Sequence, residues 1–372
     1  MTESPRSVAP DGTRYAVAAW MLDLGPSGAR TRLLALLRAL PPLLADDEHV
    51  LVLQRGRPPF AEHARLRWVP VDVPARPTWR RALAERQRLP RWLADLRADL
   101  LHLETLPVPP ALPCPVVLTV HDLRDLGPYA RRSRLLFRHV LRRSAARARA
   151  LVAPSTSSAR ALRTVVGERE IAIVAGTIDP EPAAPAAAAS SWPGAFVHVG
   201  HLEPRKDLAT LLTAYARARG DEPALAPLVL AGRDAGSRRR LELQAGQLGI
   251  ADRVHFLGTV TDDALHALYR DARAVVVPSR GEGFGLPALE ALAAGVPVLV
   301  SDAGALPEVV ADAGTVVAAG DVGAWAAALI RLARAPDDAA ARRARLARAA
   351  CFDPRRIAAD LLAVWRRAIG RA

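Results

Sequence analysis

Short apolar runs alternate with amphipathic stretches of helical period along the whole chain. In the first half, these runs predict strands at 15–20, 49–53, 100–103, 116–120, 151–153 and 171–174, with helices such as 29–40 and 80–96 between them. After residue 194 the alternation begins again and predicts strands at 196–199, 228–231, 254–257, 274–277 and 296–300. Helices are expected at 206–219 and 237–248, after Thr261 and from Pro287. Because this alternation is typical of parallel sheets covered by helices, it predicts an α/β protein of two Rossmann-like, doubly wound domains.

A segment rich in proline, alanine and serine at 181–194 interrupts the pattern and is predicted to be a linker. It separates an N-terminal domain at 1–180 from a second domain at 195–350. The last segment, 351–372, predicts a helix at 354–369 with an apolar side, which could pack back on the first domain. No fixed-period repeat is visible, which excludes a solenoid.

The formal net charge is +13, but the chain has a single lysine and its many arginines are spread along its whole length. The densest basic stretch, 131–149, holds eight arginines and no acid and predicts a core helix with a solvated basic face. The side of that helix expected to be buried carries Leu136, Phe137, Val140, Leu141 and Ser144. Contact of the basic face with an anionic membrane is the alternative.

The two cysteines, Cys114 and Cys351, lie in no CxxC motif and no Cys/His cluster, which argues against a disulfide framework and a zinc site. The N-terminus shows no basic-then-apolar leader, and no run of eighteen apolar residues lacks a charge or proline. We therefore expect a cytoplasmic protein that is neither secreted nor membrane-spanning.

The segment PSRGEGFGLPALEALAAGVPVLVSDAGALPEVV at 278–310 follows a predicted buried strand and opens a helix. Its glycines let the backbone pass close to a ligand, and Pro287 suits the first helical turn. Unpaired N–H groups of residues 284–288 would point at an anion, so the segment predicts a diphosphate cradle. Glu282 in the loop and Glu290 in the helix can face one crevice. Taken singly, they could equally be a solvated loop acid and an acid that complements the helix N-terminus.

This segment resembles the E-x7-E element of the retaining glycosyltransferases of family 4, whose GT-B architecture sets two Rossmann domains facing each other across a cleft. Two further blocks are similar to that family, HVGHLEPRKDLATLLTAYA at 198–216 and RVHFLGTVTDDALHALYRDARAVVVPS at 253–279. Together the three blocks cover nearly all of the second half. The first half resembles the family more faintly, at 24–40, 119–123 and 152–162.

The resemblance implies that Glu290 hydrogen-bonds the donor ribose, that Glu282 touches the donor sugar, and that Arg205 and Lys206 bind the diphosphate. Lys206 is the only lysine in the chain. Its retention points to a need for a compact ammonium, with chance as the alternative. The donor-binding residues expected from the resemblance are Gly28, Gly200, Arg205, Lys206, Arg233, Leu257, Glu282, Gly283, Phe284, Gly285, Leu286 and Glu290.

Two positions depart from the family pattern. Many members carry arginine where this chain has His201, so Arg205 is expected to supply that charge. Members also often carry an asparagine before Gly-x-x-Asp at the domain junction, where this chain has Ala175.

In the first domain, Gly25 and Gly28 lie in the loop after the first strand, where bare backbone lets a ligand approach; a plain β-α turn is the alternative. His121 follows the predicted strand 116–120 at the carboxyl edge of the sheet, where open α/β sheets bind ligands. The resemblance places His121 near the donor sugar and the acceptor, and makes it a catalytic residue together with Glu282, Lys206 and Arg205. A purely structural histidine is the alternative.

Cleavage of the bond between sugar and diphosphate leaves negative charge on the phosphate, which Lys206, Arg205 and backbone N–H groups could stabilise without a metal. The sequence contains no Asp-x-Asp element of the kind that metal-dependent glycosyltransferases use, and we expect no cofactor. The resemblance therefore implies a retaining, metal-independent hexosyltransferase that uses a nucleotide-diphosphate sugar. The expected mechanism is front-side departure and attack guided by the leaving phosphate.

The acceptor is left open by the sequence, as are the donor base and sugar and the oligomeric state. A hydroxyl of a small-molecule natural product is the first expectation, and a membrane-associated transferase acting on lipid-linked or polysaccharide acceptors is the alternative. The rival enzyme class is a GT-B relative such as a nucleotide-sugar epimerase or a glycogen-type phosphorylase. The phosphorylase would need a pyridoxal lysine, whereas the only lysine matches the diphosphate site. In another class, an arginine-rich nucleic-acid-binding protein without enzymatic activity is the alternative, although it would lack interleaved aromatic residues and any zinc motif.

Overall fold

The computed structural model describes residues 12–25, 27–121, 134–179, 190–335 and 338–371. The chain forms two compact units, Met1–Asp179 together with Asp353–Ala372, and Pro180–Phe352. The domain boundary predicted at residue 180 lies beside this division. Of the predicted linker at 181–194, residues 181–189 fall outside the described residues.

The first unit is built on a seven-stranded sheet in the order β3-β2-β1-β4-β5-β6-β7. All neighbouring strands in it pair in parallel. The strands are β1 (Thr13–Ala18), β2 (Glu48–Gln54), β3 (Leu66–Pro70), β4 (Leu100–Leu103), β5 (Val116–Thr119), β6 (Ala150–Ala153) and β7 (Ile171–Ile173). Its helices are α1 (Gly28–Ala39), α2 (Thr78–Asp95), α3 (Arg134–Arg147), α4 (Thr156–Val166) and α12 (Pro354–Ala368), with 3-10 turns at Trp20–Asp23 and Pro41–Leu43.

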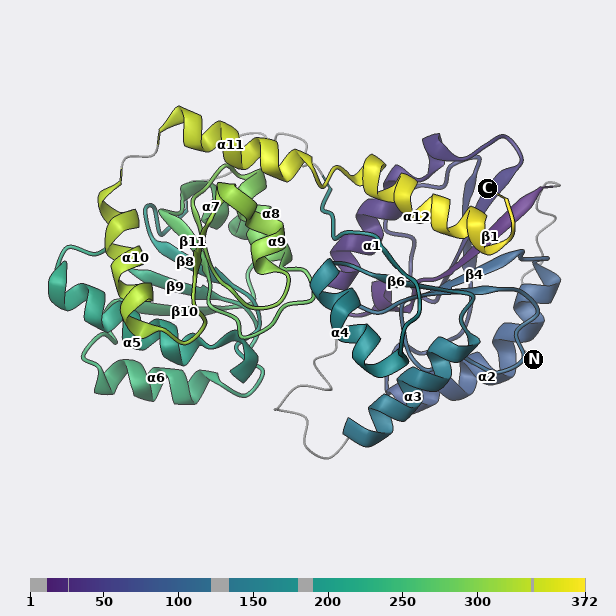
Figure 1. The fold of residues 1–372 in the computed structure, drawn as a ribbon, viewed down its shortest axis with the longest axis horizontal. Helices are drawn as coiled ribbons and strands as arrows, with labels where there is room; N and C mark the ends of the chain where they lie inside the picture. The colour runs from purple at the N-terminus through teal and green to yellow at the C-terminus, as the bar shows by residue number, and fades with distance from the viewer. Residues whose placement is uncertain (1–11, 26, 122–133, 180–189, 336–337, 372) are drawn as a thin grey trace. The chain divides into compact units, whose positions relative to one another are not determined.

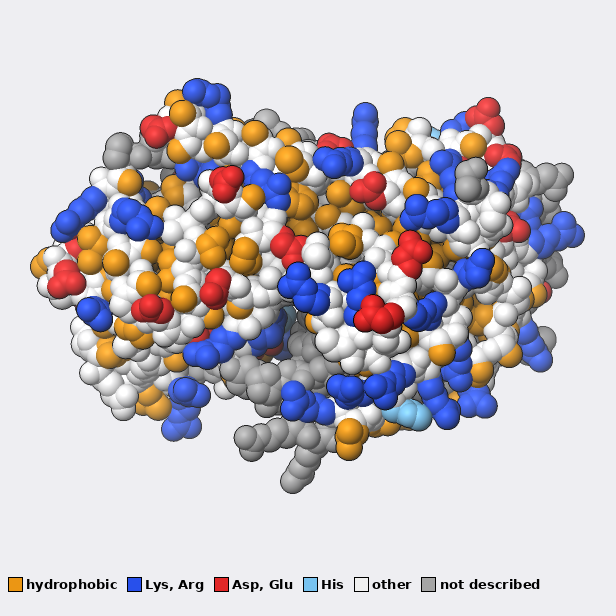
Figure 2. All heavy atoms as spheres, in the orientation of Figure 1, with side chains coloured by type: hydrophobic (Ala, Val, Ile, Leu, Met, Phe, Trp, Pro, Cys, Tyr) orange, Lys and Arg blue, Asp and Glu red, His pale blue; other side chains and the backbone are white. Residues whose placement is uncertain are grey.

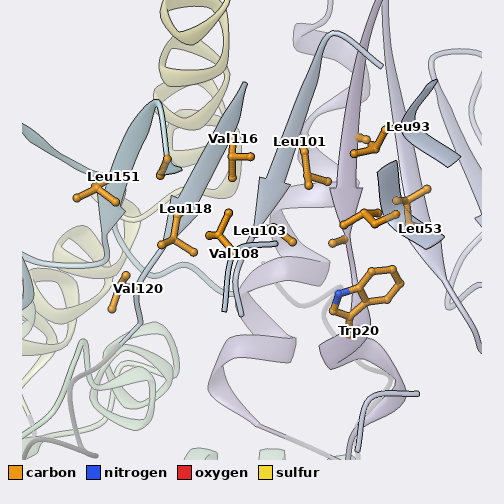
Figure 3. Close-up of a cluster of buried hydrophobic side chains, with 14 of the residues drawn as sticks. Trp20, Leu53, Leu93, Leu101, Leu103, Val108, Val116, Leu118, Val120 and Leu151 are labelled. Carbon is orange, nitrogen blue, oxygen red and sulfur yellow. The ribbon is translucent and has the colours of Figure 1, made fainter. Parts of the chain in front are cut away.

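Helices cover both faces of this sheet (Figure 1). Because successive side chains of a strand point to opposite faces, Ala16 and Ala18 of β1 pack with α2, α3 and α4, whereas Tyr15 and Val17 pack with α1 and α12. Figure 3 shows the first of these two clusters, in which Leu101 of β4 lies among apolar side chains from neighbouring strands. The apolar runs of the sequence are thus buried on both sides, as a parallel sheet requires.

The C-terminal helix α12 belongs to the first unit, although the whole second unit precedes it in sequence. The buried indole of Trp365 donates a hydrogen bond to Nδ1 of His102 on β4 at 3.0 Å and lies against the ring of Tyr15. Arg366 forms an ion pair with Glu48 at 2.6 Å. Figure 1 shows α12 lying beside α1, and this helix completes the hydrophobic core on that face.

The second unit has a six-stranded parallel sheet in the order β10-β9-β8-β11-β12-β13. Its strands are β8 (Phe196–Val199), β9 (Leu228–Ala231), β10 (Val254–Gly258), β11 (Ala274–Val277), β12 (Val298–Ser301) and β13 (Thr315–Val317). Its helices are α5 (Leu208–Asp221), α6 (Arg238–Gln247), α7 (Asp262–Asp271), α8 (Leu286–Ala293), α9 (Leu306–Val310), α10 (Val322–Arg334) and α11 (Ala339–Ala350), with 3-10 turns at Pro204–Lys206 and Ala311–Ala313.

Both units contain the doubly wound strand order of the Rossmann fold, in which the order reverses beside the first strand. The prediction of an α/β protein with two such domains is therefore confirmed. Two strands were missed: β3, in which the polar Arg67 interrupts the apolar run, and β13, which has only three residues.

The basic stretch at 131–149 differs in part from its prediction. Residues 131–133 lie outside the described residues, and α3 buries Leu141 and Ser144 as expected. Leu136, however, was expected on the buried side and is 67% exposed, because the first turn of α3 extends beyond the core that its later turns contact. The neighbouring Leu135 is 84% exposed.

Candidate functional site

The glycine-rich loop at 278–285 connects β11 to α8 at the carboxyl edge of the second sheet. The turn that carries Arg205 and Lys206 follows β8, and β8 pairs directly with β11. These two strands flank the point where the strand order reverses, which is where open α/β sheets bind their ligands. The topology therefore brings together two segments that lie about 75 residues apart at the expected binding position.

Glu282 is the centre of this cluster. Its carboxylate accepts hydrogen bonds from Nζ of Lys206 at 2.7 Å, from Nη1 of Arg205 at 2.9 Å and from Oγ of Ser279 at 2.7 Å. Arg205 also pairs with Glu203 at 2.7 Å and donates to the carbonyl of Gly281. Three of the four residues predicted to be catalytic, Arg205, Lys206 and Glu282, thus contact one another directly.

The electrostatics of the cluster follow from its burial. Desolvation alone would raise the pKa of Glu282, but the charges of Lys206 and Arg205 and the hydrogen bonds from Lys206 and Ser279 outweigh it and lower the pKa to about 2. The carboxylate is consequently ionised at neutral pH and neutralises part of the charge of two cations. Lys206 is only 7% exposed, so its ammonium is held in one place and largely removed from water.

Gly200 leaves room for that ammonium at the end of β8. A methyl group built at this position would lie 3.3 Å from Cε and 3.4 Å from Nζ of Lys206. Beneath it, the fully buried His198 is hydrogen-bonded through Nδ1 to the carbonyl of Val276 at 2.9 Å. Burial and the charge of Lys206 lower the pKa of His198 to about 4, so that histidine is neutral at physiological pH.

The start of α8 differs in detail from the predicted cradle. The helix begins at Leu286, after Gly285 with a φ of +102°, and a methyl group at Gly285 would lie 2.6 Å from Leu306. The N–H of Ala288 bonds to the carbonyl of Gly285 at 2.9 Å, and Pro287 has no N–H. Of the N–H groups at 284–288, residues 287 and 288 are therefore excluded from anion binding, because one lacks the donor and the other already uses it.

Phe284, predicted as a donor contact, is buried and packs edge-on against Phe352 with 5.4 Å between ring centroids. Its side chain fixes the loop, which leaves its backbone as the part that could meet a ligand. Gly283 precedes it in the same loop.

Glu290 lies on the second turn of α8, and its Oε2 accepts a hydrogen bond from the hydroxyl of Tyr269 at 2.5 Å. Tyr269 is in the last turn of α7 and is buried. Burial and the adjacent carboxylate raise the pKa of Tyr269 well above its usual value, so the phenol keeps its proton and acts as the donor.

Two other predicted donor contacts lie on neighbouring parts of the same edge. Arg233 is exposed in the loop after β9, and Leu257 is half-buried on β10. The backbone of Arg233 bonds to that of Leu202, whose segment carries Arg205 and Lys206. No contact between either side chain and Glu282 is found among the residues that the structure describes.

The first unit carries its own polar cluster at the carboxyl edge of its sheet. His121 follows β5, and its Nε2 lies 3.4 Å from Oε2 of the fully buried Glu104, which directly follows β4. The other oxygen of Glu104 pairs with Arg32 of α1 at 2.9 Å. Burial would raise the pKa of Glu104, but His121 and Arg32 lower it to about 2. Gly28 is the exposed first residue of α1, after the capping residue Ser27.

Sequence reasoning missed four residues that support these clusters: Ser279, Tyr269, His198 and Glu104. Ser279 stands directly after the apolar run of β11, and Tyr269 lies within a segment similar to the family, so both were within reach of the pattern. Glu104 also follows an apolar strand. His198 begins the block at 198–216 that is similar to the family, but a histidine within a strand does not reveal what lies beside it.

No group of three or more His, Cys, Asp or Glu side chains placed to hold a metal ion occurs in the described part of the chain. Likewise, none of the helices described is both long and apolar enough to cross a membrane.

Two family models match consecutive parts of the chain. The model described as Glycosyltransferase Family 4 matches residues 26–182, and the model described as Glycosyl transferases group 1 matches residues 189–350. The second match contains Arg205, Lys206, Glu282 and Glu290.

Curated relatives match less than half of the chain. D-inositol 3-phosphate glycosyltransferase of Salinispora tropica is 44% identical over 186 residues, which is 46% of this chain and 38% of the relative. O-antigen chain mannosyltransferase B of Escherichia coli is 40% identical over 106 residues, 28% of each chain. The match thus spans well under half the length of these curated relatives.

Solved structures match almost the whole chain. Sucrose-phosphate synthase from Thermosynechococcus elongatus superposes with a TM-score of 0.77 at 21% identity, covering 97% of this chain and 100% of that one. The Anabaena protein HepE in complex with UDP gives 0.65 at 19% identity, covering 95% and 100%. At these identities the likeness shows the fold. With both family models matched along the chain and both Rossmann-like units in place, the protein belongs to the family 4 glycosyltransferases and has the GT-B fold.

Proposed function

We propose that the protein is a hexosyltransferase that moves a sugar from a nucleotide-diphosphate donor to a hydroxyl acceptor with retention of anomeric configuration. The observation that carries this proposal is the buried cluster of Glu282, Lys206 and Arg205 between β8 and β11. Two cations next to a glycine-rich loop and a helix N-terminus form a site suited to a diphosphate.

Each residue has a role in this proposal. Lys206 and Arg205 stabilise the negative charge that grows on the diphosphate as the sugar departs, together with backbone N–H groups of residues 284–286. Glu290 accepts hydrogen bonds from the donor ribose. Glu282 contacts the donor sugar and sets the positions of both cations, which it already contacts at 2.7 Å and 2.9 Å.

His121 acts on the side of the first unit, near the sugar and the acceptor. Its placement after β5, with Nε2 3.4 Å from Oε2 of the buried Glu104, supports a directed role for the imidazole. We propose front-side attack by the acceptor hydroxyl, with the leaving phosphate taking its proton. In that step the bond from sugar to phosphate oxygen breaks and the bond from sugar to acceptor oxygen forms on the same face.

The charge needed for this step is supplied by side chains, so we propose that turnover needs neither a metal nor a cofactor. A protein that binds nucleic acid without enzymatic activity has no support in this site, because Lys206 is buried and Arg205 half-buried, so the two cations form no exposed basic face. Figure 2 shows basic side chains spread over the visible surface among acidic ones, which also does not favour that alternative. Both cysteines are unpaired, in keeping with the proposed cytoplasmic location.

A panel of nucleoside diphosphates tests the proposal at its first step. UDP, GDP, ADP and TDP are each added with EDTA in excess, and thermal unfolding is measured. A diphosphate present at a hundred times its Kd stabilises the protein by about 2.7 kcal/mol, which raises the Tm. We expect such a shift with at least one of the four, and no shift with the matching nucleoside. Equal Tm values throughout would contradict the proposed donor site.

A second candidate, transfer to a lipid-linked acceptor at a membrane, is favoured by one observation. Helix α3 carries five arginines and no acid, and Leu135 and Leu136 are 84% and 67% exposed in its first turn. Leucines among arginines match the apolar and anionic layers of a lipid surface. Peripheral membrane contact through α3 would bring the first unit, which carries His121, to a lipid-linked acceptor.

Vesicle sedimentation tests this candidate. We expect the protein to bind phosphatidylcholine vesicles only when they contain phosphatidylglycerol, and the double variant Leu135→Gln, Leu136→Gln to bind several-fold less. Leu243→Gln is the matched control, because Leu243 on α6 is 62% exposed but outside this helix. If the double variant binds like the control, or if neutral vesicles bind equally, α3 is not a membrane contact.

A further inference from the structure

The hydroxyl of Tyr269 on α7 donates a hydrogen bond to the carboxylate of Glu290 on α8. The two residues are 21 positions apart, and the 2.5 Å hydrogen bond joins the last turn of α7 to the second turn of α8. Tyr269 is 4% exposed, whereas Glu290 is half-buried and keeps part of its side chain at the surface. The tyrosine therefore lies behind the glutamate as seen from the solvent side.

This hydrogen bond restricts the conformations that the Glu290 side chain can adopt. A glutamate side chain has three rotatable bonds, and it must lose that freedom to receive a ligand in one geometry. Because a buried phenol fixes Oε2 beforehand, much of that ordering is already present in the unliganded protein. A carboxylate has about four acceptor positions on its two oxygens, so the bond from Tyr269 is compatible with further bonds from a neighbouring diol.

We propose that Tyr269 is a positioning residue that aims the Glu290 carboxylate at the ribose and so makes the donor site selective for ribonucleotides over deoxyribonucleotides. This inference rests on the proposed function, in which Glu290 receives the donor ribose. It deepens that function by naming the chemical class of the donor, a ribonucleoside diphosphate sugar. A site built around a fixed acceptor rejects a ligand that lacks the matching hydroxyl, since the acceptor then stays unpaired.

The ligand pair UDP and 2′,3′-dideoxy-UDP measures this selectivity by calorimetry. Should the panel favour GDP or ADP, the corresponding pair of that base is used. We expect wild type to bind the ribonucleotide at least about tenfold more tightly, the range of one or more hydrogen bonds to a charged group. In Tyr269→Phe the ribonucleotide should bind about tenfold more weakly while the dideoxy ligand binds as before.

Tyr215→Phe is the matched control. Tyr215 is buried in the same unit on α5, and its hydroxyl donates one hydrogen bond to the carbonyl of Ala226 at 2.8 Å. Its loss should leave the ratio between the two ligands unchanged, even if Tm falls. A general loss of stability in Tyr269→Phe would weaken both ligands alike, so the ratio distinguishes positioning from a purely structural role.

The double variant Tyr269→Phe, Glu290→Gln shows whether the tyrosine acts through the glutamate. We expect it to bind the ribonucleotide no more weakly than Glu290→Gln alone, because the contact to be aimed is already gone. Additive losses, or a ligand ratio in Tyr269→Phe equal to that of Tyr215→Phe, would overturn the inference while leaving the proposed function standing. If wild type binds no nucleoside diphosphate at all, the proposed function itself fails.

Discussion

Lys206→Ala is expected to lower kcat about a hundredfold to a thousandfold, the loss seen when one donor to a developing negative charge is removed. The reason is that the negative charge on the diphosphate grows as the sugar departs, so the ammonium contributes more in the transition state than in the bound donor. Affinity for the donor should fall less than kcat. Steady-state kinetics at saturating donor measure both quantities.

Lys206→Arg tests the shape of the cation. The charge is kept, but the ammonium fits between Gly200 and Glu282, where a methyl group at Gly200 would already be 3.4 Å from Nζ. A planar guanidinium is larger, so we expect an intermediate loss of kcat. Arg238→Ala removes an exposed ion pair with Glu242 on α6 and serves as the control with unchanged kinetics. If folded Lys206→Ala turns over within a few-fold of wild type, Lys206 does not stabilise the leaving group.

Glu282→Gln is expected to lower kcat strongly without weakening the binding of UDP. We expect kcat to fall about a hundredfold or more, because the sugar contact and the alignment of Lys206 and Arg205 are lost together. The affinity for UDP should not fall, since the carboxylate that competes with the diphosphate for both cations has been removed. Calorimetry with UDP and kinetics with the full donor measure the two effects.

Stability gives a second readout of the same variant. Removing one partner of a buried ion pair typically costs about 3–5 kcal/mol, because the remaining charge has no counter-ion. The Tm of Glu282→Gln should therefore fall, and UDP should restore more of it than it adds to wild type. Glu242→Gln, which breaks the exposed pair with Arg238, is the control with little change in Tm. A Glu282→Gln variant with weaker UDP binding and wild-type Tm would contradict the competition between carboxylate and diphosphate.

The sign of the pH dependence follows from the lowered pKa. The pKa of Glu282 is about 2 in the folded protein, compared with 4.5 for a glutamate that makes no such interactions. The contribution of its ion pairs is therefore fully present above about pH 4.5 and is lost as the pH falls towards 2. The difference in Tm between wild type and Glu282→Gln should shrink over that range.

Much of the fold could be predicted because parallel strands buried on both faces read as short, continuous apolar runs. The run at 274–277 coincides with β11 and the run at 196–199 with β8, so the edge that carries the cluster was placed correctly. β3 was missed because the polar Arg67 interrupts it, and β13 because three residues give too little periodicity. The apolar side of α12 could be predicted from its periodicity, but the contact between Trp365 and His102 depends on the tertiary fold.

The candidate site was predictable as a set of residues but not as a geometry. Spacing and resemblance singled out Lys206 and Glu282, yet their contact spans 76 positions and depends on β8 pairing with β11. The same holds for Tyr269 on α7, whose hydroxyl donates to Glu290 on α8, 21 positions later. The cradle was wrong in part because, of the five residues expected to bind the anion, Pro287 has no N–H and Ala288 uses its N–H in a hydrogen bond to Gly285.

The most direct test of the central claim follows the donor itself. The protein is incubated in excess EDTA with an α-linked nucleotide sugar of the base that the thermal panel selects, and the reaction is followed by proton NMR. Water serves as acceptor, so the test needs no knowledge of the natural one. We predict release of the nucleoside diphosphate with the α-anomer of the free sugar appearing first, at a rate that Lys206→Ala lowers. Appearance of the β-anomer first, or turnover that only a divalent metal restores, would contradict the account.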